Sequence, residues 1–214
     1  MFRAIAATQW KSTRTTALLA AVAAFSLPIA ALQAARGVEN AQMFINIVQG
    51  WSAGYALLAA GAGLLLALAA WGPDHQGRHV YALSLPISRS RYAMLRFGAG
   101  ALFIGPIALA LFFGALTVIA TGAIPQGLHA YPFALTLRFL FAALVAYAIF
   151  FAIGAATTRT AAVILGAIGA LLFAQFLLYT LDVDFNLLER VGELIFGNPG
   201  ILSVFSGRWT LIDV

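Results

Sequence analysis

Five stretches of about 20 apolar residues, almost free of charge, limit what this chain can fold into. They cover residues 15–35, 51–71, 97–121, 137–156 and 161–181. A helix that crosses a lipid bilayer needs roughly 20 mostly apolar residues. Lipid cannot satisfy free backbone groups, so such runs must be helical. The sequence therefore predicts an all-α integral membrane protein with a bundle of five transmembrane helices.

Composition supports a membrane protein rather than a soluble domain. The chain is 63% hydrophobic and only 9% charged, whereas soluble proteins average about 25% charged residues. It has no cysteine, which excludes disulfides, thiolate zinc sites and iron–sulfur ligation. Without a linker or an internal repeat, we expect one membrane domain over residues 1–214.

The basic residues predict the orientation. Cytoplasmic segments of membrane proteins carry an excess of lysine and arginine. With the N-terminus in the cytoplasm, the inner segments hold Arg3, Lys11, Arg14, Arg78, Arg89, Arg91, Arg96 and Arg159, and the outer ones hold Arg36, Arg138, Arg190 and Arg208. We therefore expect a cytoplasmic N-terminus in a bacterial inner membrane. The run 15–35 exceeds the usual apolar core of a signal peptide, about 7–15 residues, and is expected to be a retained first span.

Two further expectations come from the segment after the fifth apolar run and from the glycines within the runs. Residues 182–197 place leucine, valine and isoleucine at 187, 188, 191, 194 and 195, a helical spacing that predicts an amphipathic helix at the outer interface. Gly50 and Gly54 form a G-x-x-x-G motif for close helix approach. Ordinary membrane-helix glycines are the alternative for these and for Gly61, Gly63, Gly98, Gly100, Gly154, Gly166 and Gly169.

The segment 72–96 is the most informative loop. It begins with Gly72-Pro73-Asp74, a turn signal. Pro86 interrupts it, which predicts a short helix before this proline and a new one after it. Ser88 is expected to be the N-cap of the second helix. The sequence predicts a short amphipathic element in the cytoplasm, followed by a basic turn into the third span.

Residues 81–92, YALSLPISRSRY, and residues 96–100, RFGAG, resemble the cytoplasmic loop of bacterial ABC transporter permeases of the exporter-like type-2 class. The lead 2–11 and the amphipathic segment after the fifth span also resemble that class. The resemblance implies a permease subunit that pairs with a second permease chain and a separate ATP-binding-cassette ATPase. The 72–96 loop would be the coupling element. The residues carried over are Asp74, Arg78, His79, Tyr81, Leu83, Pro86, Arg89 and Arg91. Alternatively, the arginines act only as topology signals.

One departure keeps a second function open. Permeases of that class usually have six spans and this sequence shows five, so it is either cut short or a reduced relative. A reduced relative would fit a non-transporting structural or accessory subunit of a larger respiratory or photosynthetic complex. A channel or ion-coupled carrier fits less well, because mid-span carboxylates and broken helices are not apparent.

Catalytic chemistry is not expected. The only lysine, Lys11, has no glycine-rich loop before it, so the sequence lacks a P-loop. His75 and His79 share a metal-binding spacing but have no obvious third ligand. We therefore predict no enzyme activity, cofactor, metal or nucleic-acid partner. Arg138 is either a substrate contact or an interface residue that reaches the outer headgroups. Four uncharged polar residues near or within the spans are expected to form hydrogen bonds between helices or to lie at the interface rather than to line a substrate path: Gln33, Asn46, Gln49 and Gln175.

Overall fold

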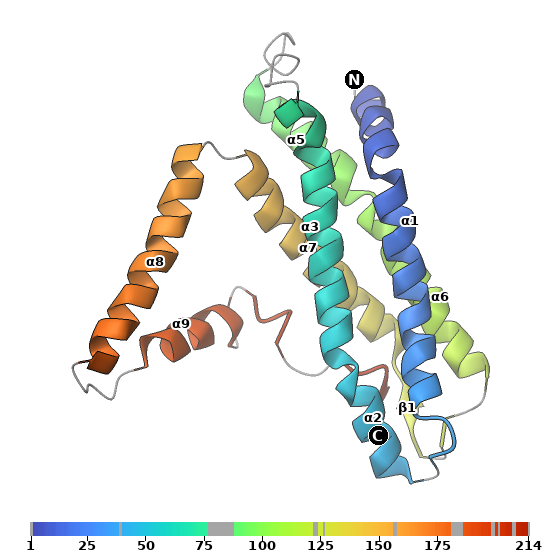
Figure 1. Ribbon diagram of the computed structural model, residues 1–214. Helices are drawn as coiled ribbons and strands as arrows, with labels where there is room; N and C mark the ends of the chain where they lie inside the picture. The colour runs from blue at the N-terminus through green and yellow to red at the C-terminus, as the bar shows by residue number, and fades with distance from the viewer. Residues whose placement is uncertain are drawn as a thin grey trace. The chain divides into compact units, whose positions relative to one another are not determined.

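The computed structural model describes residues 2–38, 40–76, 88–121, 124–125, 127–155, 158–180, 186–197, 200, 202–206 and 209–213. Its chain is mostly helical (Figure 1). Among the described residues, four helical stretches are long and apolar enough to cross a membrane: Phe2–Ala34, Ala41–Gly72, Ser90–Ala120 and Pro132–Ala155. These stretches support the predicted helical membrane protein, while the fifth span stays a prediction.

The helices run further than the apolar runs suggested. Helix α1 is Phe2–Ala34 and includes Pro28, so the basic lead 2–11 is continuous with the first span. The second stretch consists of α2, Ala41–Gly50, and α3, Ser52–Gln76. The third consists of α5, Arg89–Ala101, and α6, Ile104–Ala120. Helix α7 is Pro132–Ala155. The predicted loop 72–96 is therefore shorter, because helices occupy both of its ends.

The contacts group the chain into two compact units. Unit 1 is Met1–Gly154 together with Arg208–Val214, and unit 2 is Ala155–Gly207. The single domain expected from the sequence stays a prediction. In unit 1, α1 packs against α6, α3 and α5.

Glycines allow the closest helix contacts in unit 1, but mostly not at the predicted motif. An added Cβ at Gly63 would lie 2.6 Å from the Tyr147 nitrogen, and one at Gly114 would meet the Phe25 carbonyl oxygen. Gly54 faces Leu27 at an ordinary 3.6 Å, and Gly50 has no described neighbour within 4 Å. A close approach at Gly50 through the G-x-x-x-G motif therefore stays a prediction. An added Cβ would also have no described neighbour within 4 Å at three other glycines, Gly61, Gly166 and Gly169.

A short sheet lies in unit 1 that the sequence did not predict. Strand β1, His129–Ala130, pairs antiparallel with β2, Ile212–Asp213, in the register His129 to Asp213 and Ala130 to Ile212. Tyr131 extends this pairing by donating its N–H to the Leu211 carbonyl, 2.7 Å away. We call residues 209–213 the strap. It returns the chain to unit 1 after unit 2.

Unit 2 contains α8, Thr158–Thr180, and α9, Leu187–Phe196. The Gln175 side-chain oxygen of α8 accepts hydrogen bonds from the Leu187 and Leu188 N–H groups, at 2.7 and 3.2 Å. Asn186 also caps α9, by accepting from the Glu189 N–H. The expected hydrogen bond between helices at Gln175 is confirmed. Residues 187–196 of the predicted amphipathic segment are helical; their position at a membrane interface stays a prediction.

Candidate functional site

The predicted coupling residues fall into two groups in the structure. Arg78, His79, Tyr81, Leu83 and Pro86 lie outside the described residues, together with the rest of 77–87. The backbones of Asp74 and Arg89 belong to α3 and α5, but their side chains are not described. Arg91 is exposed on the first turn of α5. The described site is therefore the pair of helix ends on either side of 77–87, which we call the loop end of unit 1.

Helix α5 begins where the sequence predicted. Ser88 has an extended backbone, and its hydroxyl accepts from the Arg91 N–H at 3.4 Å. Such a cap satisfies one of the free N–H groups of a helix start. The N-cap prediction at Ser88 is confirmed, and it fixes where the chain re-enters the helix bundle after 77–87.

Arg96 joins the two helices that flank 77–87. It is only 7% exposed. Its Nε donates to the Ala70 carbonyl of α3 at 2.7 Å, and one of its terminal nitrogens donates to the Tyr92 hydroxyl. Its guanidinium also lies 5.3 Å from the centre of the Trp71 ring. A buried cation needs such partners, because its desolvation is costly. Arg96 therefore holds the C-terminal part of α3 against α5.

Trp71 extends this contact to α7. Its Nε1 donates to the Phe151 carbonyl at 3.0 Å, and the two rings lie 5.0 Å apart. The Trp71 ring lies so close to Gly154 that an added Cβ there would be 2.7 Å from Cδ1. Phe97 of α5 also packs against the Tyr147 and Phe151 rings of α7. The loop end is thus a rigid aromatic contact among three helices.

Gln9, a buried polar residue of α1, also lies at the loop end. Gln9 is 4% exposed, and its side-chain amide lies beside the Tyr147 hydroxyl without a well-formed hydrogen bond to any described residue. An added Cβ at Gly100 would lie 2.6 Å from Gln9 Nε2 and would also meet the Tyr147 hydroxyl. The Thr13 hydroxyl donates to the Gln9 carbonyl at 2.8 Å. A larger residue at position 100 would therefore have to displace the ends of the Gln9 and Tyr147 side chains.

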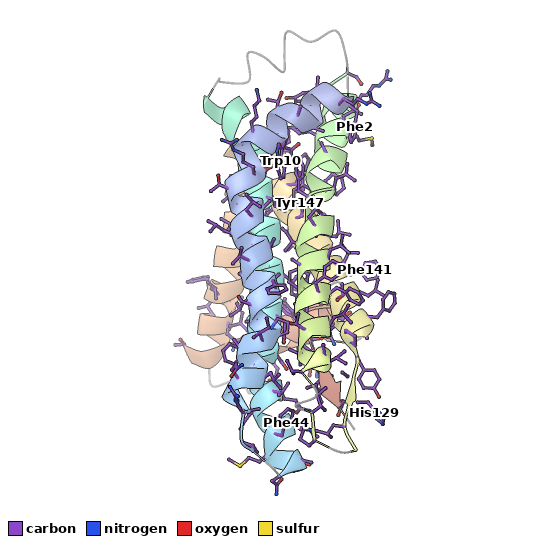
Figure 2. The ribbon with its side chains drawn as sticks, turned by 90° about the vertical axis from the view of Figure 1, so that its right-hand side faces the viewer. Phe2, Trp10, Phe44, His129, Phe141 and Tyr147 are labelled. Carbon is purple, nitrogen blue, oxygen red and sulfur yellow. The ribbon has the colours of Figure 1, made fainter. Side chains whose placement is uncertain are left out.

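Arg138 lies at the opposite end of unit 1, which we call the strap end. Figure 2 shows the two ends, with Phe2 and Trp10 at one and Phe44 and His129 at the other. The Arg138 guanidinium lies 5.0 Å from the centre of the Trp209 ring. Trp209 is 2% exposed, and its carbonyl accepts from the Ser52 hydroxyl at 3.3 Å. The described contact of Arg138 is therefore with the strap; a substrate contact stays a prediction.

Metal chemistry finds no support in the described part of the chain. No group of three or more histidine, aspartate or glutamate side chains there could hold an ion. The side chain of His75 and all of His79 lie outside the description.

Comparison with known proteins gave no relative: no family model, no curated protein and no solved structure matches the chain.

Sequence reasoning missed the residues that build the two ends. The sequence predicts only a topology signal at Arg96 and only an ordinary small helix residue at Gly100, and it predicts no role for Trp209. The available signal was spacing: Tyr92 and Arg96 are four residues apart and share a helix face. Nothing in the sequence indicated that residue 209 contacts residue 138.

Proposed function

We propose that this protein is the membrane-spanning permease subunit of an ATP-driven ABC transporter, coupled to a separate ATPase through residues 72–96. The observation that carries the proposal is the Arg96 contact. It fastens both helices that flank 77–87 to each other, and Trp71 fastens them to α7. Helices joined in this way would move together when a partner displaces one of them.

The charge distribution at the loop end supports the same proposal. Arg3, Lys11, Arg14 and Arg91 are all exposed there. Basic residues mark the cytoplasmic side of membrane helices, which is where an ATPase works. The proposal includes α8 as a fifth span, a bacterial inner membrane, a cytoplasmic N-terminus and a second permease chain as partner.

Site-directed cross-linking tests the proposal, because the chain has no cysteine. A single cysteine is introduced at Leu83 or at Arg91 and labelled with a maleimide–benzophenone reagent, and illumination of native membranes then links the benzophenone to C–H bonds of any adjacent chain. We expect both variants to capture a chain with a P-loop, identified by mass spectrometry. The matched control is Arg36→Cys, exposed after α1 in the opposite part of unit 1, which should not capture it. Capture from position 36 alone, or of no P-loop chain, would contradict the proposal.

A second candidate is a non-transporting structural subunit of a larger membrane complex. It is favoured by the apolar interior of unit 1. Among the described residues, the buried polar side chains are Gln9, Thr13 and Arg96, near the loop end, and the Tyr55 hydroxyl of α3, so few polar groups line the described interior. In gentle purification from native membranes, co-purifying cofactor-bearing subunits without an ATPase would support this candidate over the permease.

A further inference from the structure

Three cations of α1 lie on one face of the helix. An α-helix turns by about 100° per residue, so residues 3, 11 and 14 fall within about 80° of arc. Arg3, Lys11 and Arg14 are all exposed. Gln9 and Thr13 are buried and fall on another side of the helix, toward α5 and α7. The three cations therefore form a ridge that faces away from the packed interior, and we call it the basic ridge.

The same face of α1 becomes apolar immediately after the ridge. Leu18, Val22 and Phe25 follow it along the helix within about the same arc. They are 60%, 66% and 39% exposed. One helix face thus changes from cationic to apolar between residues 14 and 18. Water-exposed leucine, valine and phenylalanine would be costly, whereas this order matches the change from headgroups to hydrocarbon across a bilayer surface.

From this juxtaposition we infer that the basic ridge, Arg3, Lys11 and Arg14, binds the phosphate groups of anionic phospholipids in the adjoining leaflet. Guanidinium and ammonium groups form charge-assisted hydrogen bonds with phosphate. Trp10, 43% exposed and packed at 5.4 Å on Phe103, adds an amphipathic ring of the kind found at headgroup level. The occupant is a lipid rather than an acidic protein face, because the surface continues directly into exposed apolar side chains.

This inference concerns lipid selectivity and does not rest on the proposed transport function. The ridge and the loop end share the same part of unit 1. Figure 2 shows the first turns of α1, with Phe2 and Trp10, at that end. Lipid bound there would hold the first turns of α1 at the membrane surface, next to the Gln9 contact with α5 and α7.

Spin-label lipid binding tests the inference. The purified full chain is reconstituted in phosphatidylcholine vesicles with spin-labelled phosphatidylglycerol or spin-labelled phosphatidylcholine, and the ratio of association constants is measured. We expect the wild type to prefer phosphatidylglycerol, and R3Q/K11Q/R14Q to reduce that preference to near one. A cation near an anionic surface is worth about 1 kcal/mol, or about fivefold in association. High salt should weaken the wild-type preference as well.

Controls separate the ridge from general charge. The variant R36Q/R190Q removes two exposed arginines elsewhere and should keep the preference. R3K/R14K keeps the charges and should also keep most of it. If the triple variant inserts poorly, Lys11→Gln alone should still lower the ratio about two- to fivefold. An unchanged ratio in K11Q or the triple variant, or an equal loss in R36Q/R190Q, would overturn the inference. So would loss of a co-purifying acidic protein from the triple variant with an unchanged lipid ratio.

Discussion

The loop end and the strap end of unit 1 each place an arginine against a tryptophan, but they are assembled differently. At the loop end, Arg96 reaches Ala70 and Trp71 across 26 residues or fewer. At the strap end, Trp209 meets Ser52 across 157 residues, and it also meets Arg138. Closing a longer chain segment costs more conformational entropy. The comparison teaches that the arginine–tryptophan contact of the loop end joins helices on either side of one loop, whereas that of the strap end needs the chain to return after unit 2.

Truncation of the strap tryptophan should have the largest effect. Trp209 is 2% exposed, and replacing a buried tryptophan by alanine leaves a cavity and costs about 3–5 kcal/mol. We expect Trp209→Ala to lower the melting temperature in detergent micelles. It should also speed hydrogen exchange at the Tyr131 amide, which donates to Leu211.

The same variant also tests whether the strap end and the loop end unfold independently of each other. Trp10→Ala is the matched control, because this ring is 43% exposed and its loss should cost much less. In Trp209→Ala, amides of α5 at the loop end should keep their wild-type exchange rates. Equal loosening of both ends would show that the two ends are one cooperative unit.

Removal of the loop-end cation should rank second. Arg96→Met keeps an extended, apolar side chain but leaves the Ala70 carbonyl and the Tyr92 hydroxyl without this donor. A hydrogen bond to a charged group contributes about 1.5–3 kcal/mol, so we expect the loss of these bonds to lower the free energy of unfolding by about 2–3 kcal/mol. Equilibrium unfolding in mixed micelles measures it.

Arg91→Met provides the control for this variant. Arg91 lies on the same helix but is exposed, and surface substitutions usually change stability by less than about 0.5 kcal/mol. Equal effects of the two substitutions would mean that burial of Arg96 contributes nothing, and would break the parallel with Arg138.

Gln9 offers a substitution of the opposite sign at the loop end. Its buried amide lies beside the Tyr147 hydroxyl but has no well-formed hydrogen bond among the described residues, and a buried amide without good hydrogen bonds is destabilising. We expect Gln9→Leu, similar in volume, to raise the free energy of unfolding by about 1 kcal/mol. Gln33→Leu, at an exposed position of α1, should not raise it. A destabilised Gln9→Leu would mean that the amide has a polar partner in the membrane.

The sequence alone predicts the helices, but it predicts only some of the contacts at the loop end and the strap end. Apolar runs of about 20 residues identify membrane helices because lipid imposes that length, and Ser88 was recognised because capping depends on local sequence. The predicted first span starts too late and the predicted second span ends too early, because α1 begins at Phe2 and α3 continues to Gln76, both in polar segments. Gly100 and Gly63 looked like any membrane glycine, because only their neighbours on α7 and α1 distinguish them. The β1–β2 pair involves two residues per strand, too few to leave an alternating pattern.

Loss of the strap-end cation, Arg138, should change the free energy of unfolding least, and it tests the contact with Trp209 directly. A cation–π contact contributes about 0.5–1 kcal/mol at exposed sites and more when desolvated, and Arg138 is half-buried. We expect Arg138→Gln to cost about 1 kcal/mol, and Arg138→Lys, which keeps the cation, to cost less. A double-mutant cycle of Arg138→Gln with Trp209→Leu should give a coupling energy of similar size, measured by unfolding in mixed micelles. The same cycle with Arg190→Gln, exposed on α9, should give none. A coupling energy of zero for Arg138 and Trp209 would show that their proximity stabilises nothing, and would favour the substrate contact as the role of Arg138.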